Sequence, residues 1–283
     1  MKRKKWTKMG YVSGAISTML LMIAVLAPFI ANPGSNDDGF FPVVKFGPEA
    51  VDTMHVLSDP NADHWMGTDY VGRDVFARLV HGIKNSIFFS IAVVAGCLVI
   101  GMFLGGIMGF FGGWIDLILS RFLEVVANFP MFLLQLTILA FLPQSYTILF
   151  LVMVLPGWIP YCRFIRAEFF KLRNQEFVQA AQVVGVSSWR LFLKHLFPNS
   201  LTPIITYIPF DISMTITALG ALSFLGFGEP IHIASLGELL KQAREHFLHA
   251  WWLAAYPGGV LFMLTLSLAL FGSSLRDVLD PRN

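Results

Sequence analysis

In this 283-residue chain, Asp211 is the one carboxylate that we place deep inside an apolar segment. An ionisable side chain at that depth is costly unless it faces water or a polar partner, so Asp211 is a candidate functional residue. It could line a path for a transported molecule, or act as the coupling site of an ion-driven transporter. It could equally pair with a polar group of a neighbouring subunit or stay protonated, and the sequence leaves these alternatives open.

A second group of polar residues stands just before an apolar segment. Its residue types and spacing are those of a tight turn: Gly67, Thr68, Asp69, Gly72, Arg73 and Asp74. Gly72 frees the backbone for the turn, and Arg73 can pair with either Asp69 or Asp74. The pattern favours a structural latch over a direct role in binding a substrate.

The sequence lacks the usual motifs for catalysis, nucleotide binding and metal binding. It has no Gly-x-x-x-x-Gly-Lys-Ser/Thr phosphate loop, so ATP would have to be bound by another chain. It has neither a His-Glu-x-x-His motif nor paired cysteines, and we interpret His246 and His249 as an exposed surface pair. The sequence therefore predicts no catalytic residue, no metal site and no cofactor bound by this chain.

The composition indicates a helical membrane protein. Hydrophobic residues make up 55% of the chain and charged residues 13%, with a mean hydropathy of +0.66, which is more apolar than a soluble domain tolerates. A membrane-spanning helix needs about 20 apolar residues, and the alternating strands of a β-barrel are absent from the sequence. We expect an all-α, polytopic fold with six transmembrane helices, at residues 10–31, 86–111, 119–142, 147–161, 200–226 and 250–272.

These spans divide the chain into four parts. The first apolar segment is longer than the about 7–15 residues usual for a cleaved signal peptide, so we interpret it as a span. The parts are a cytoplasmic tail with the first helix (1–31), an external loop (32–84), a five-helix core (85–273) and a cytoplasmic tail (274–283).

A face without side chains is expected in the second span. Gly101, Gly105 and Gly109 recur there at every fourth position, so they share one side of a helix. Such a face lets another helix approach closely.

The basic residues predict the orientation of the chain. Of the 20 Lys and Arg residues, 14 lie on the side that holds both termini and residues 163–197, and 6 lie on the other side. By the positive-inside rule the termini and that segment are cytoplasmic. Short basic clusters between apolar segments concern orientation, so no nucleic-acid partner is expected.

The most informative local pattern lies in residues 163–198, between the fourth and fifth predicted spans. We expect a short helix that ends near Gly185, a tight turn, and a second helix that Ser187 or Ser188 can cap. Pro198 is expected to break the chain before the fifth span. Such an element would form a compact projection on the cytoplasmic face.

This pattern resembles the signature of the permease subunits of ATP-binding cassette (ABC) importers, which is Glu-Ala-Ala, three residues, Gly, nine residues, then Ile-x-Leu-Pro. Ala180, Ala181, Gly185 and Pro198 match in register, while Gln179, His195 and Phe197 replace the usual Glu, Ile and Leu. The resemblance implies a coupling helix that sits in a groove of a cytoplasmic ATPase and transmits its closure to the spans. Gln179 could hydrogen-bond to that ATPase but could not form a salt bridge with it.

Two further stretches resemble the second, C-type, permease of dipeptide and oligopeptide importers. They are residues 66–82, which contain the polar turn, and residues 223–228 with 235–240. The resemblance implies the bacterial inner membrane, with short peptides as cargo moved by alternating access. It also implies the partners, namely the lipid bilayer, a second and different permease subunit, two ATPase subunits that hold ATP and Mg²⁺, and an external solute-binding protein that delivers the cargo.

Three alternatives remain. A nickel or metal-chelate ABC permease shares the same motifs. An ion-coupled secondary transporter would use Asp211, but it predicts internal repeats that the two halves of the chain lack. A membrane scaffold without transport would leave the spacing between Gly185 and Pro198 unexplained.

Overall fold

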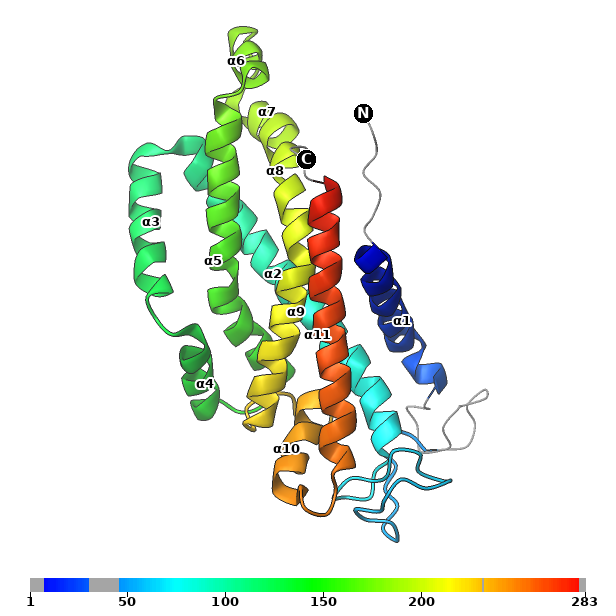
Figure 1. The fold of residues 1–283 in the computed structure, drawn as a ribbon. Coiled ribbons are helices and arrows are strands. Elements are labelled where there is room, and N and C mark those ends of the chain that lie inside the picture. Colours follow the sequence, from blue (N-terminus) through cyan, green and yellow to red (C-terminus); the bar gives the residue numbers. More distant parts are fainter. Residues whose placement is uncertain (1–7, 31–45, 231, 280–283) are drawn as a thin grey trace.

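The computed structural model describes residues 8–30, 46–230 and 232–279, and Figure 1 shows them as a bundle of long helices. The side chains at 8–10, 28, 29, 182, 188, 189, 195, 202, 203 and 279 lie outside the described part. Within it, regular structure is helical apart from two isolated β-bridges, Val51 with Arg73 and Thr68 with Asp74. The predicted all-α fold is confirmed.

Four helices of the described part are long and apolar enough to cross a membrane. They are α2 (Val75–Phe111), α5 (Tyr146–Arg173), residues Ile204–Phe224 of α9 (Thr202–Phe224), and residues Trp252–Val278 of α11 (Trp252–Leu279). The chain is therefore a multi-pass helical membrane protein, as the sequence predicted.

The count of six spans stays a prediction. The third predicted span is divided into α3 (Gly113–Ala127) and α4 (Met131–Phe141). Together the two helices are long and apolar enough to cross a membrane, but they are bent by 75° at the break between them, residues 128–130. The first helix, α1 (Lys8–Ile30), contains a shorter apolar stretch, Tyr11–Ala27.

Helices α2 and α5 pack closely along the predicted glycine face. A Cβ atom on Gly101 would collide with the Cβ of Tyr161, and one on Gly109 would collide with the Cβ of Phe169. A Cβ on Gly105 would collide with the backbone carbonyl oxygen of Cys162. The glycines therefore let the two backbones touch, which confirms the prediction.

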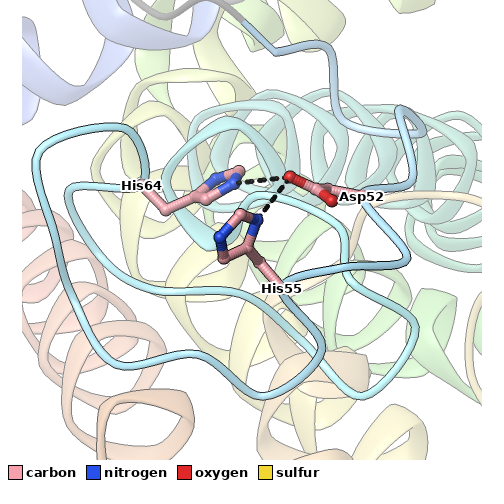
Figure 2. A group of neighbouring side chains, drawn as sticks. All are labelled: Asp52, His55 and His64. Atoms are coloured by element: carbon pink, nitrogen blue, oxygen red, sulfur yellow. Dashed lines mark hydrogen bonds and ion pairs between the residues drawn. The ribbon is translucent and has the colours of Figure 1, made fainter.

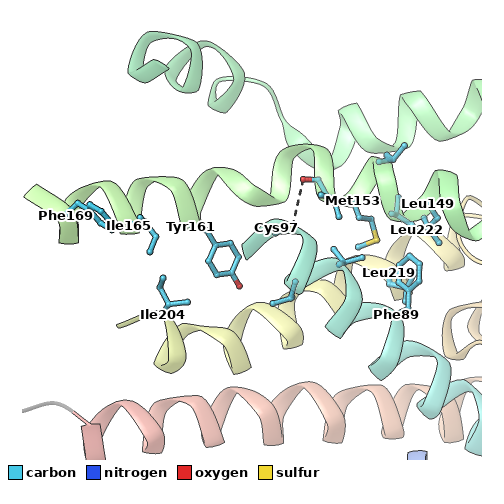
Figure 3. Packing of buried hydrophobic residues seen from close by; sticks show 14 of the residues in the cluster. Phe89, Cys97, Leu149, Met153, Tyr161, Ile165, Phe169, Ile204, Leu219 and Leu222 are labelled. Carbon is cyan, nitrogen blue, oxygen red and sulfur yellow. Dashed lines mark hydrogen bonds between the residues drawn. The ribbon is translucent and has the colours of Figure 1, made fainter. Parts of the chain in front are cut away.

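The main core lies where α2, α5 and α9 meet (Figure 3). Helix α5 supplies Tyr161, Ile165 and Phe169, which are completely buried and recur at every fourth position. Their spacing continues one helix face past the predicted end of the fourth span at residue 161. For this reason α5 runs on to Arg173 instead of ending at Tyr161.

The two ends of the bundle carry different elements (Figure 1). Helices α6 (Glu176–Val183), α7 (Ser188–Leu191) and α8 (Phe197–Ser200) lie at the end where α11 finishes. We call this the α6 end. Helix α10 (Leu236–His246) and residues 46–74 lie at the opposite end, which we call the loop end.

Helical structure also extends into the segments predicted to be loops. Helix α2 begins at Val75, not near residue 86, because the carboxylate of Asp74 accepts a hydrogen bond of 2.8 Å from the backbone N–H of Ala77 and caps the helix. The predicted loop 227–249 contains α10, whose Leu236, Leu239 and Ala243 form a buried face.

Candidate functional site

The α6 end has the predicted helix, turn and helix. Helix α6 ends at Val183, and Gly185 has a φ of +84°, a left-handed conformation that favours glycine. The N–H of Val186 donates to the carbonyl of Ala181 at 3.0 Å, which is the hydrogen bond of a Schellman helix end. Helix α7 then begins at Ser188. The predicted helix end near Gly185 is therefore confirmed.

The outer surface of α6 is small, apolar and exposed. Gln179 and Ala180 are exposed and Ala181 is half-buried, while the side chain of Val183 is 88% exposed and that of Val184 is 81% exposed. A Cβ on Gly185 would have nothing within 4 Å. Exposed apolar side chains gathered on one short helix are typical of a contact surface for another protein.

An aromatic cluster connects the α6 end to the long helices. The ring of Phe192 lies 5.2 Å from that of Phe169 on α5 and 5.4 Å from that of Phe110 on α2, measured between centroids. Leu191 and Leu196 of the same segment are buried in the main core. A displacement of residues 188–200 would therefore press directly on α2 and α5.

Pro198 does not interrupt the helix at its own position, but a turn at Leu201 separates α8 from α9, so the chain is broken before α9 three residues later than predicted. Residues Phe192–Leu196 form a π-helical turn, η1, in which the N–H of Phe197 donates to the carbonyl of Phe192, and α8 then includes Pro198 near its start. A wider turn tolerates a residue that has no N–H and whose ring would clash in a regular α-helix. The predicted residue His195 lies in η1, and its side chain is outside the described part.

At the loop end, four charged side chains are buried together. Asp69 receives a hydrogen bond of 2.7 Å from Arg73, and Glu238 of α10 receives one of 2.9 Å from Arg78 of α2. Two longer ion pairs, Arg78 with Asp69 at 3.6 Å and Arg73 with Glu238 at 3.7 Å, close the group. We call Asp69, Arg73, Arg78 and Glu238 the charge clamp. Because they belong to different segments, they fix the polar turn to α2 and α10.

The rest of the polar turn supports this clamp. Gly72 has a φ of +90°, and a Cβ there would collide with the carbonyl of Asp52. The carbonyl of Thr68 accepts a hydrogen bond of 3.1 Å from the Trp252 indole at the start of α11. Gly67 also has a left-handed backbone, with a φ of +75°. These contacts hold the turn to Asp52 and to the start of α11.

Asp74 holds the start of α2 rather than pairing with Arg73. Besides capping the helix, its carboxylate lies 2.9 Å from the Nδ1 atom of His64. Burial raises the pKa of Asp74 above its ordinary value, while its hydrogen bonds to Ala77 and His64 act in the opposite direction.

Asp211 has a partner within its own chain. The hydroxyl of Tyr161, on α5, donates a hydrogen bond of 2.7 Å to the carboxylate of Asp211, on α9, and Asp211 is half-buried. Sequence reasoning considered a partner in another subunit and did not consider Tyr161. A role for Asp211 in transport stays a prediction.

Sequence reasoning missed three features of these sites. Glu238 was not recognised as the partner of Arg78, because 160 residues separate the two. The ion pair of Arg166 with Asp116, which joins α5 to α3, was also missed. So was a cluster of Asp52, His55 and His64 at the loop end, whose spacing fits no metal motif.

Comparison with solved structures shows the class of fold. The chain is similar to the crystal structure of an amino acid ABC transporter with histidines, with a TM-score of 0.53 and 13% identity, over 70% of this chain and 92% of that one. At this identity the likeness concerns the fold alone. Together with the apolar helices, it shows the fold class of a multi-pass helical membrane protein.

Comparison of sequences identifies the family. Residues 101–283 match the family described as "Binding-protein-dependent transport system inner membrane component". The dipeptide transport system permease protein DppC of Alkalihalophilus pseudofirmus is 31% identical over 281 residues, which are 99% of this chain and 88% of that protein. The chain belongs to this family of inner-membrane permease subunits.

Two other relatives support the assignment. The oligopeptide transport system permease protein OppC of Bacillus subtilis is 29% identical over 100% of this chain and 88% of its own length. The peptidoglycan transport system permease protein YejE of Agrobacterium fabrum is 38% identical over 77% of this chain. In that case the match covers 57% of the relative's length.

Proposed function

We propose that the chain is the C-type permease subunit of an ABC importer for short peptides. The observation that carries the proposal is helix α6 with the turn that follows it: Gln179, Ala180 and, in the turn, Gly185 are exposed, and Ala181 is half-buried. The printed names of the relatives, which refer to dipeptide, oligopeptide and peptidoglycan transport, support peptides as the cargo. They support this cargo over nickel.

In this proposal α6 transmits the movement of a cytoplasmic ATPase. Two ATPase subunits, which bind ATP and Mg²⁺, close and displace α6, and Phe192 passes the displacement to Phe110 of α2 and Phe169 of α5. Because α2 and α5 touch along their glycine face, they would move as one body. Contacts of α6 that differ between the open and closed ATPase would drive alternating access.

The remaining partners and the orientation follow from the same proposal. The α6 end and both termini face the cytoplasm, and the loop end receives an external solute-binding protein. A second, different permease subunit completes the path, which includes Asp211. The distribution of basic residues supports this orientation. The charge clamp supports it as well, because a rigid loop end suits a docking surface.

Uptake into proteoliposomes tests the proposal. The chain is reconstituted with its candidate second permease, ATPases and binding protein, and the uptake of a radiolabelled dipeptide and of radioactive Ni²⁺ is measured with and without ATP. We expect ATP-dependent uptake of the dipeptide that unlabelled dipeptide inhibits and Ni²⁺ does not. Uptake of Ni²⁺ without peptide uptake would establish a metal permease, and uptake driven by an ion gradient without ATP would establish a secondary transporter.

A further inference from the structure

Three side chains that could bind a metal ion converge at the loop end (Figure 2). They are Asp52, His55 and His64, and one potential ligand atom from each lies within 4.8 Å of the other two. The Oδ2 atom of Asp52 is 2.8 Å from Nδ1 of His55 and 3.7 Å from Nε2 of His64. Two imidazoles and one carboxylate are a frequent ligand set of zinc in proteins.

His64 is held in the orientation that a metal ligand needs. Its side chain is 1% exposed, and its Nδ1 atom lies 2.9 Å from the carboxylate of Asp74. The other ring nitrogen, Nε2, is buried, points toward Asp52 and has no hydrogen-bond partner. A buried polar atom without a partner needs an explanation, and a histidine oriented by a carboxylate through its other nitrogen is typical of metal sites.

The backbone around the three residues is fixed by its own hydrogen bonds. The N–H of Asp52 donates to the carbonyl of Gly72 at 2.9 Å, and the carbonyl of His55 accepts from the hydroxyl of Thr68. The side chain of Asn61 accepts a hydrogen bond of 2.9 Å from the N–H of His64 and so sets the turn that carries it. The ligands are thus positioned in advance, which lowers the cost of binding.

The two separations that involve Asp52 are close to those of a tetrahedral ion. Zinc bonds of about 2.0–2.2 Å place neighbouring ligand atoms about 3.3–3.6 Å apart. The separation of Asp52 and His64 is close to this range, whereas His55 must move back by roughly half an ångström. The side chain of His55 is 55% exposed, so it is free to do so.

We propose that Asp52, His55 and His64 bind one divalent transition-metal ion, zinc by the nature of these ligands, at the loop end of the protein. His64 binds through Nε2, Asp52 through its carboxylate, and a solvent molecule completes the coordination. Since His64 is joined to the Asp74 cap of α2, the ion fastens residues 52–64 to the start of that helix. The ion is a structural component and not the cargo, so this inference does not depend on the proposed function.

Zinc binding by the purified full-length chain tests the inference. The chain is prepared in detergent without a polyhistidine tag, and its affinity for Zn²⁺ is measured by competition with a chromophoric chelator. We expect one ion per chain, and a loss of affinity of at least about 100-fold in Asp52→Asn and in His55→Ala, because removing a ligand costs more than removing its support. The exposed His249 is the matched control, and His249→Ala should bind like the wild type.

A second measurement separates a lost ligand from a misfolded loop. Zn²⁺ should raise the unfolding temperature of the wild type and of His249→Ala but not that of His55→Ala, whose side chain is too exposed to be needed for folding. Equal zinc affinity and equal stabilisation in wild type and His55→Ala would overturn the inference. So would the absence of zinc binding in the wild type, or its loss in His249→Ala.

Discussion

At the loop end, buried charged side chains join three segments of the chain, whereas at the α6 end apolar and aromatic contacts hold the helices and leave one face open. The charge clamp has partners at 2.7 and 2.9 Å within the same chain. Helix α6 instead buries Val178 and exposes Val183. The loop end thus buries its charged groups within the chain, whereas the α6 end leaves an apolar surface exposed.

The difference indicates which end is rigid and which is made to engage a partner. A buried group of charges is stable only as a complete set, because each unpaired member would pay its desolvation cost. It therefore resists partial movement. An exposed apolar helix that ends in a Schellman turn keeps its shape without a partner. When a partner covers it, the burial of its apolar surface stabilises the complex. These properties suit a fixed docking face and a moving coupling helix.

Removing one member of the charge clamp should have the largest effect on stability. Arg78→Ala leaves Glu238 without its partner at 2.9 Å and Asp69 without one of its two, so the free energy of unfolding should fall by about 3–5 kcal/mol. Thermal unfolding in detergent measures it. The control is Arg121→Ala, whose ion pair with Glu124 is exposed and should contribute less than about 1 kcal/mol. Equal losses in both variants would show that burial of the clamp is not what matters.

The contact between α2 and α5, which joins the two ends, should be the next most sensitive. Gly105→Ala places a methyl group against the backbone of Cys162, and this overpacking should cost about 1–3 kcal/mol. Gly259→Ala on α11 has nothing within 4 Å and should instead stabilise the helix by about 0.5–1 kcal/mol. Unfolding temperatures that shift in the same direction in both variants would contradict the packing described for the glycine face.

A smaller effect on stability is expected from Glu229, whose contribution should depend on pH. Burial raises the pKa of Glu229, which lies between α9 and α10, above its ordinary value of 4.5, and hydrogen bonds from Ser235 and Tyr146 oppose the shift only in part. The stabilisation from the protonated form is therefore complete below about pH 4.5 and is lost as the pH rises through the raised pKa.

Glu229→Gln, which cannot ionise, isolates this contribution. Its unfolding temperature relative to the wild type should increase as the pH is raised from about 4.5. The hydroxyl of Tyr146 can still donate to the amide oxygen, so the 3.1 Å contact persists. Curves for the two proteins that stay parallel over the whole series would show that Glu229 does not titrate in this range.

Local signals in the sequence predicted the local parts of the structure. The helical class, the glycine face of α2 and the helix end at Gly185 each depend on residues within a few positions of one another. In such cases the backbone preferences and the spacing alone decide the structure. The polar turn was predicted as a latch for the same reason, although both acids remained possible partners of Arg73.

The features that sequence reasoning missed depend on long-range contacts. The partner of Arg78 lies on α10, and the partner of Asp211 lies on α5. Arg78 is charged and was placed in the predicted external loop. It is instead a buried residue of α2, because the charge clamp supplies its partners. The π-turn before Pro198 is a further example, since it depends on how the segment packs on Phe169.

The most direct test of the account is whether α6 binds the ATPase. The ATPase retained by the wild type, by Ala180→Arg and by Ala62→Arg is compared after co-purification in detergent. Ala180 lies on the exposed face of α6, and Ala62 is an equally exposed alanine at the loop end. Neither change should alter the free energy of unfolding by more than about 0.5 kcal/mol.

We expect Ala180→Arg to lose the ATPase, with binding weakened by at least about tenfold, because an arginine at the centre of a packed contact costs more than 1.4 kcal/mol. The wild type and Ala62→Arg should retain it equally. If Ala180→Arg holds as much ATPase as the wild type, α6 is not the coupling helix, and the role assigned to the α6 end is contradicted.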